Sequence, residues 1–474
     1  MARSSRRRRA WIRTDRRPTA PARTARPPVP AARHRCEALL DSVVNRHTGR
    51  HVEQAWWRWY GPLDTERFTA AWQSVMDRET ILRAAFECAP QPRLVFHLHA
   101  RAEVVRHRAG TVDWNELLEQ DRLHGFDLSR PGPLRVTLVD TGAPGVTRVL
   151  LTFHDGLLDA LSVSVLRNEF SRAYLGGGVL PGGERRPDVR DWTHWLECQD
   201  ATAARDFFRR ALPADPPAVL PALPGPPTRQ HGHGRAEARL STAEAARLHR
   251  WAAGRGLPDS SVLHAAWALL LYRAAQASGP VPVGFGVTVS GRGIPLDCAE
   301  RLVGPMRGCL PMTVQVEAGQ PVGALLAALR DRALDMAAYE WVCAGQIQEW
   351  TGRPDRPLES LVCLEPAPRP LPALQARLAD AGIRYGHCHA RGSHSLLPLA
   401  LLVRDGADGS RLLTVVHDRA RIRDADAALL AGQCARLLRR LSAFDGAETV
   451  AEVLELLGGD ELPRAAPDRP GAGH

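Results

Sequence analysis

Three ionisable side chains that could take part in chemistry lie within six residues of one another: His154, Asp155 and Asp159. A histidine imidazole titrates near neutral pH, so it can accept or donate a proton under ordinary conditions. A carboxylate has an unperturbed pKa of about 3.9, which burial in an apolar setting raises. The spacing therefore indicates a site for proton transfer or for pairing with a positively charged group.

The segments on either side of these residues would hold them rigidly. Residues 149–153 are apolar and β-prone, which is typical of a strand. Beyond the ionisable residues, apolar side chains recur at helical spacing at Leu161, Val165, Leu166 and Phe170. We therefore expect a strand that delivers the polar groups to the beginning of a helix.

Residues 154–160 resemble the signature of the condensation domains of nonribosomal peptide synthetases, which belong to the chloramphenicol-acetyltransferase-like acyltransferase superfamily. That signature is two histidines, three variable residues, then aspartate and glycine. Aligned without a gap, His154 takes the first histidine, Asp159 the aspartate and Ala160 the glycine. Asp155 occupies the position of the second histidine, to which the family's catalysis is usually assigned.

Further motifs follow in the family's order between about residues 50 and 445. DRETILRAAF supplies Arg83 at the arginine position of one motif, and GFDL with PLR precedes the signature strand. VTVSGR ends at Arg292, and LVGPMRGCLP follows it. This ordered series is more specific than any single match.

The resemblance implies an α+β fold of two chloramphenicol-acetyltransferase-like lobes in a V, with a tunnel between them. It implies a free-standing acyltransferase of secondary metabolism that forms an amide or ester between intermediates held on carrier proteins. Phosphopantetheine arms would bring these substrates, and no cofactor would bind the chain directly. A catalytically inactive relative that binds carrier proteins or recruits tailoring enzymes is the alternative, and the sequence leaves both open.

The same resemblance suggests roles for individual residues. Asp155 and His154 are the candidate catalytic residues, although a hydrogen-bonded position beneath the tunnel floor is the role we favour for His154. Asp155 would be a poor base if exposed, but a working base if buried in an apolar tunnel. Asp159 is expected to form a structural ion pair, with Arg83 as the first choice of partner and Arg292 as the second.

Glycine-rich and charged stretches predict the domain organisation. Residues 1–35 hold twelve arginines against one acidic residue, Asp15, so they carry all of the net charge of +10 and leave the remainder near neutral. Such a segment cannot bury a core and is expected to be disordered. The predicted units are a disordered tail at 1–35, an N-terminal lobe at 36–180, a C-terminal lobe at 181–457 and a loose tail at 458–474.

Composition limits the kinds of binding partner and the cellular compartment that we expect for the protein. Nine scattered cysteines without a C-x-x-C pair indicate a reduced, cytoplasmic protein. The near-neutral body gives no basic surface for nucleic acid, and no apolar run is long enough to span a membrane. His387, Cys388, His389 and His394 are ligand types without a matching pair elsewhere, so we expect no metal. A monomer that binds acyl or peptidyl carrier proteins is the expected state.

Overall fold

The computed structural model describes the chain in ten stretches, with side chains from residue 38 onward. They are residues 29–30, 33–88, 92–182, 186–212, 232–277, 279–352, 358–365, 371–392, 397–406 and 408–458. Most of the two expected tails, residues 1–28 and 459–474, lie outside these stretches. Within them, every helix is too short or too polar to cross a membrane.

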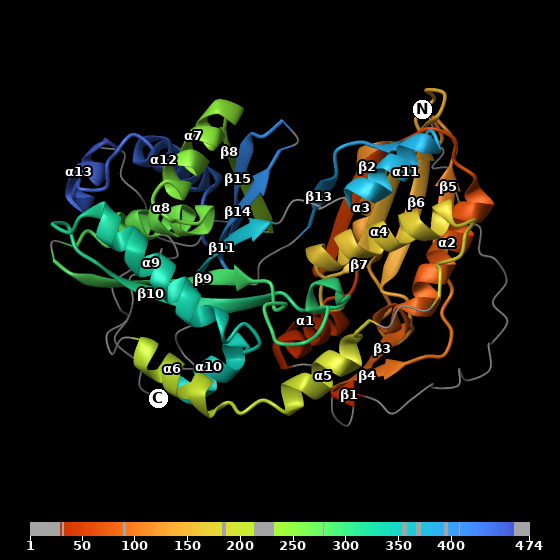
Figure 1. Cartoon of the computed structure of the whole chain (residues 1–474), viewed down its shortest axis with the longest axis horizontal. Helices are drawn as coiled ribbons and strands as arrows, with labels where there is room; N and C mark the ends of the chain where they lie inside the picture. Colours follow the sequence, from red (N-terminus) through yellow and green to blue (C-terminus); the bar gives the residue numbers. More distant parts are fainter. Residues whose placement is uncertain are drawn as a thin grey trace, which may run out of the picture.

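A mixed sheet forms the centre of the N-terminal half of the molecule (Figure 1, right). Its strands, in spatial order, are β12 (Arg384–Tyr385), β2 (Val52–Tyr60), β7 (Val146–His154), β6 (Leu134–Asp140) and β5 (Glu103–His107), and β13 (His389–Arg391) also pairs with β2. β5 and β6 are parallel, whereas the other pairs are antiparallel. The sheet therefore carries the end of the signature strand, His154, in a central position.

Helices α2 (Thr65–Arg78), α3 (Trp114–His124), α4 (Ala160–Leu175) and α11 (Pro372–Asp380) cover this sheet. Helix α1 (Arg33–Val44) lies at the end of β7, where Ser42 contacts His154. The Asp64 carboxylate caps α2 by accepting from the backbone N–H groups of Glu66 and Arg67. Phe68 and Trp72 follow at helical spacing and are fully buried on its inner face. The cap thus sets the residue at which α2 begins, and the apolar periodicity sets the face that it turns towards the core.

The C-terminal half contains a second mixed sheet (Figure 1, left). Its strand order is β10 (Gly308–Val316), β9 (Val281–Val289), β11 (Ser360–Glu365), β14 (Leu399–Asp405), β15 (Arg411–Asp418) and β8 (His233–Leu240). Its helices are α7 (Thr242–Ala253), α8 (Asp259–Ala274), α9 (Val322–Ala337), α10 (Ala344–Thr351), α12 (Asp424–Leu441) and α13 (Val450–Glu455). α8 is buried nearly all round, as its continuous apolar sequence predicts.

The two halves do not separate at the expected boundary between residues 180 and 181. Linker helices α5 (Val189–Glu197) and α6 (Thr202–Ala211) follow it, yet Val189 and Trp192 of α5 belong to the N-terminal core. Residues 294–306 and 374–383 also contribute to that core. The chain thus returns to the first lobe twice beyond the predicted boundary, and on the second return β12 and β13 pair with β2.

Regular structure also begins earlier in the described chain than expected. β1 (Val29–Pro30) pairs antiparallel with β4 (Arg93–Phe96), which in turn pairs with β3 (Ala84–Glu87). Helix α1 begins at Arg33. Regular structure therefore reaches into the stretch predicted as a tail, because an edge strand offers free backbone groups with which two residues can pair.

Candidate functional site

The signature residues lie where β7 ends and α4 begins. β7 ends at His154, and the Asp159 carboxylate caps α4 by accepting from the backbone N–H of Ser162 at 2.8 Å. The backbone N–H of Asp155 donates to the carbonyl oxygen of His51 at 3.0 Å. The loop is thus tied at one end to the residue that precedes β2 and at the other to its own helix.

His154 is buried, with 1% of its surface exposed. Its Nδ1 accepts a hydrogen bond from the backbone N–H of Gly156 at 3.1 Å, so the ring proton of a neutral imidazole is assigned to Nε2. Nε2 then donates to the Ser42 hydroxyl oxygen at 2.8 Å. A Cβ on Gly156 would lie 3.0 Å from the His154 ring, which explains why the glycine is needed there. Both ring nitrogens are therefore engaged inside the protein.

Asp155 faces a histidine that the sequence analysis did not identify. Its carboxylate lies 3.1 Å from Nδ1 of His51, and Nε2 of His51 lies 2.9 Å from the Asp41 carboxylate. The side chain of His51 is 3% exposed, against 21% for Asp155. Burial lowers the pKa of His51, but hydrogen bonds and charge from Asp155 and Asp41 outweigh it, so the net pKa is raised.

This arrangement changes what the loop can do chemically. The second position of the signature holds a carboxylate bound to an imidazole that favours its protonated form. Neither nitrogen of His51 is left for a substrate, because each faces an aspartate. His51 lies 104 residues from Asp155 in sequence, so no local pattern could have revealed the pair.

Asp159 forms a buried ion pair with Arg292. The two guanidinium nitrogens Nη1 and Nη2 donate to its carboxylate oxygens at 2.8 and 3.0 Å, a bidentate geometry. The side chains are 3% and 4% exposed, respectively. Backbone N–H groups of Met306 and Arg307 donate to Asp159 as well, both at 3.0 Å. Burial would raise the pKa of Asp159, but the Arg292 charge and the hydrogen bonds from Arg292 and Ser162 lower it.

This ion pair joins the two halves of the chain. The segment that carries Arg292 and Met306 comes from the C-terminal half and docks on the start of α4. Gly291 adopts φ +64°, and a Cβ there would lie 2.0 Å from the Met306 carbonyl oxygen. Only glycine fits that approach, so the G-R dipeptide is explained by the turn that aims Arg292 at Asp159.

Arg83, the first choice of partner, is corrected to Arg292. Arg83 ends a short 3-10 helix, Thr80–Arg83, and its Nη1 donates to the carbonyl oxygens of His97 and Leu98 at 3.1 and 2.8 Å. It therefore supports the chain after β4 instead of the signature loop. The separation in sequence between Asp159 and each arginine does not indicate which of the two forms the ion pair.

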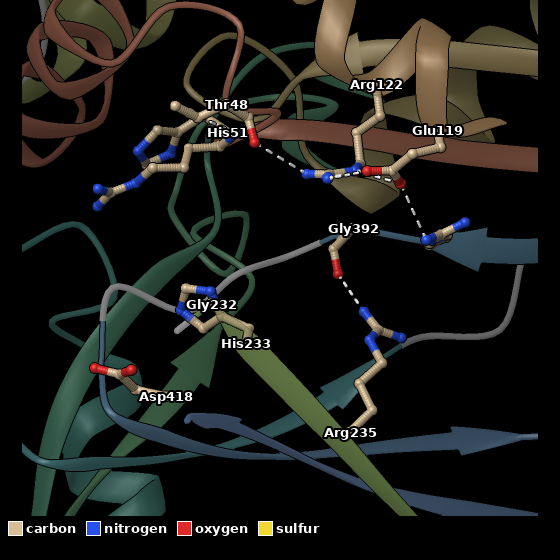
Figure 2. Close-up of a pocket in the computed structure, with 11 residues that line it drawn as sticks. Thr48, His51, Glu119, Arg122, Gly232, His233, Arg235, Gly392 and Asp418 are labelled. Atoms are coloured by element: carbon tan, nitrogen blue, oxygen red, sulfur yellow. Dashed lines mark hydrogen bonds and ion pairs between the residues drawn. The ribbon is translucent and has the colours of Figure 1, made fainter. Parts of the chain in front are cut away.

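A cavity of about 620 Å3 opens between the two halves (Figure 2). Charged groups from both sides line it, among them His51 and Arg122 from the first lobe and Arg235 from β8. Arg235 donates to the carbonyl oxygen of Gly392 at 2.6 Å (Figure 2). Arg391 pairs with Glu119 at 3.2 Å. The contacts hold the returning strand β13 against β8 and α3, beside the loop that bears His51.

The described residues contain no group of three or more histidine, cysteine or acidic side chains that could hold a metal ion. His387 and His389 meet edge to face with ring centroids 4.9 Å apart, and His394 lies outside the described residues. The eight cysteines with described side chains are free thiols.

Two mixed sheets, packed with helices and joined through a signature loop, define a two-lobed α+β protein. Residues 41–362 match the model of the condensation domain, and the chain belongs to that family. It is a domain of the kind found in the synthetases that assemble nonribosomal peptides.

Several relatives illustrate the match. A polypeptide of the linear gramicidin synthase from Brevibacillus parabrevis is 30% identical over 330 residues, which cover 66% of this chain and 4% of that protein. Chondramide synthase from Chondromyces crocatus is 30% identical over 325 residues, which cover 64% of this chain and 8% of that protein. The chain thus spans less than a tenth of the length of either relative.

Solved structures share the fold. The first condensation domain of the calcium-dependent antibiotic synthetase matches with a TM-score of 0.74 at 18% identity, over 91% of this chain and 99% of that one. The X-domain from teicoplanin biosynthesis matches with a TM-score of 0.68 at 22% identity, over 91% and 98%. The predicted α+β fold with two lobes of the chloramphenicol-acetyltransferase type is confirmed.

Proposed function

We propose that this chain binds carrier-tethered intermediates of a nonribosomal peptide synthetase, and that its signature loop holds the fold instead of supplying a catalytic base. The observation that carries the proposal is the contact between Asp155 and the buried His51 imidazole. Carrier proteins with phosphopantetheine arms are the partners implied by family membership. Recruitment of a tailoring enzyme to such a carrier would fit the same role.

The protonation states of Asp155 and His51 support a structural role for the loop. General-base catalysis needs a group that lies within hydrogen-bonding distance of the attacking amine and accepts its proton. The pKa of His51 is raised by Asp155 and Asp41 despite its burial, which extends the pH range over which the imidazole carries a positive charge. If Asp155 took up a proton, the buried imidazolium would keep Asp41 as its one described counter-charge, and the loss of the other is costly. The loop therefore favours a stable ion pair over proton transfer.

Acyl transfer that forms an amide or ester is the second candidate, and one observation favours it. Asp155 is the more accessible member of its pair, at 21% against 3%, so a substrate amine could reach the carboxylate. In that case Asp155 would orient or deprotonate the nucleophile, with His154 buried beneath it. The buried ion pair between Asp159 and Arg292 would keep the loop in place for either role.

An assay with loaded carrier proteins separates the two candidates. The chain is mixed with a donor carrier that bears an aminoacyl thioester and an acceptor carrier whose aminoacyl group has a free amine. Amide formation is measured by mass spectrometry. The proposal predicts carrier binding with no amide above the protein-free background, and no change for Asp155→Asn. A rate above background that falls about 10²–10⁴-fold in Asp155→Asn would establish general-base catalysis instead.

A matched control guards against non-specific effects of the substitution. Asp297→Asn makes the same chemical change at an exposed position in the segment 290–307. It should leave carrier binding and any turnover as they are in the unaltered chain. If Asp297→Asn and Asp155→Asn reduced turnover equally, the loss would not report on the signature loop.

A further inference from the structure

A second cavity, of about 930 Å3, lies along α4 on the N-terminal lobe. Helix α11 and strand β12 form its other walls, and the turn after β14 closes one end. Most of its lining is apolar, from residues of α11 and the chain that follows it: Leu371, Leu374, Leu378 and Ile383. The space is large enough for a small organic molecule with an apolar body.

One lining residue is a buried arginine that has no acidic partner among the residues the structure describes. Arg167 projects from α4 and is 7% exposed. Within the described stretches, no residue receives a hydrogen bond or an ion pair from its guanidinium. Its one described contact is with the Trp57 ring, whose centroid lies 5.8 Å from the guanidinium carbon.

That contact does not compensate for the burial of the charge. Cation–π attraction weakens towards a separation of about 6 Å, which is where this pair lies. A buried guanidinium normally has a carboxylate or several hydrogen-bond acceptors around it, because removal of its water is costly. As far as the described residues go, Arg167 therefore lines the cavity as a cation with unused hydrogen-bond donors.

Other polar groups of the cavity do not supply the missing anion. Asp405 at the far end is already paired with Arg411 at 2.7 Å, and Arg384 adds a second positive charge. Ser171 donates its one hydroxyl proton to the Arg167 carbonyl oxygen at 2.8 Å, so the Tyr385 hydroxyl, also at 2.8 Å, donates to Ser171. Burial raises the pKa of Tyr385 to about 12, so it stays neutral. The polar wall is therefore net positive.

We propose that this cavity is a binding site for a hydrophobic carboxylic acid. The carboxylate pairs with Arg167, and the apolar body lies along Leu374, Leu378 and Ile383. The inference is independent of the proposed carrier-binding role, because it involves no carrier protein and no transfer step. Failure of either one leaves the other standing.

The test compares three probes with the full chain by isothermal titration calorimetry. Octanoate has both the charge and the chain, octanol has the chain alone, and acetate has the charge alone. Octanoate should bind at least tenfold more tightly than octanol, and acetate should not bind measurably. A hydrogen bond to a charged partner supports a difference of about tenfold to a hundredfold.

Arg167→Met keeps an unbranched, largely apolar stem and removes the guanidinium charge. The variant should lose the preference for octanoate over octanol while octanol affinity stays the same. Arg377→Met on α11 is the matched control, since Arg377 is exposed and does not line the cavity, and it should bind as the unaltered chain does. Ala379→Trp, which fills the groove from an exposed lining position, should weaken both ligands.

Three results would overturn the proposal. The first is equal affinity for octanoate and octanol in the unaltered chain. The second is an octanoate affinity that Arg167→Met leaves unchanged, which would place the ligand elsewhere. The third is an absence of octanoate binding at millimolar concentration. Tighter binding of octyl phosphate than of octanoate would replace the carboxylate with a phosphate ester as the ligand class.

Discussion

Two aspartates four residues apart, Asp155 and Asp159, have opposite surroundings. Asp159 is 3% exposed in its side chain, pairs with an arginine, and accepts from three backbone N–H groups. Asp155 is 21% exposed in its side chain and pairs with a histidine. An arginine stays charged at any ordinary pH, whereas a histidine titrates near neutrality.

The difference shows how one short loop can hold a permanent and a conditional interaction. The ion pair of Asp159 with Arg292 joins the two halves of the chain and persists across the physiological range. The pair of Asp155 with His51 depends on the proton of the imidazole, which the neighbouring aspartates retain to a higher pH than usual. The first is therefore expected to determine stability, and the second to respond to pH.

The largest effect is expected from Asp159→Asn. The substitution leaves Arg292 buried without a counter-charge, and breaking a buried pair in this way costs about 3–5 kcal/mol. Urea unfolding at pH 7 measures the change in the free energy of unfolding. The double variant Asp159→Leu with Arg292→Met should recover part of the loss, because it removes both charges.

The control for this variant is Asp297→Asn, whose site is exposed and which should change stability by less than about 0.5 kcal/mol. A loss below about 1 kcal/mol for Asp159→Asn would contradict the assigned role. In that case the bidentate contact would contribute little net stability, and the halves would be held by the later segments that pack into the N-terminal core.

A smaller, pH-dependent effect is expected from Asp155→Asn. The charged hydrogen bond to His51 should contribute about 1–2 kcal/mol when the imidazole is protonated. Because the folded pKa of His51 is raised, this stability is fully present below its unfolded pKa of about 6.5 and is lost as the pH rises through the folded value. Unfolding free energies of both chains between pH 5.5 and 9 should therefore converge at the alkaline end. A constant difference across that range would show that the pair does not titrate.

Much of the signature could be predicted from the sequence, since its elements are local. The expected strand and helix around His154 are present as β7 and α4, with the ionisable residues between them. Apolar alternation and helical periodicity are properties of short segments, so they can be recognised without knowledge of the fold. The GR dipeptide at Arg292 was identified by its match to a family motif, whereas the close approach of Met306 that explains its glycine depends on the fold.

The remaining features depend on contacts between distant segments. His51 meets Asp155 only because Val52 pairs opposite His154 at the end of two long strands. The pairing of Val29 with Leu94 and of Ala390 with Ala55 likewise joins segments far apart in the chain. Strand register between such segments is set by the assembled sheet, and no composition or spacing argument can supply it.

The burial of Arg167 in α4 also depends on contacts between distant segments. In the sequence, nothing beside Arg167 indicates that its side chain is buried. In the structure it is buried because α11 and β12, from some 210 residues downstream, cover that side of α4. The place of Arg167 in the lining of a cavity therefore depends on those distant segments.

The most direct test of the central claim is the pKa of the His51 imidazole. Histidine-labelled protein is titrated by NMR, and the His51 resonance is assigned by its loss in His51→Gln. The account predicts a pKa above 6.5 in the unaltered chain and a clear fall in Asp155→Asn, because burial then lowers the pKa with one counter-charge fewer. A His51 pKa at or below 6.5 in the unaltered chain, unmoved by Asp155→Asn, would contradict the pair and return Asp155 to the position of a candidate base.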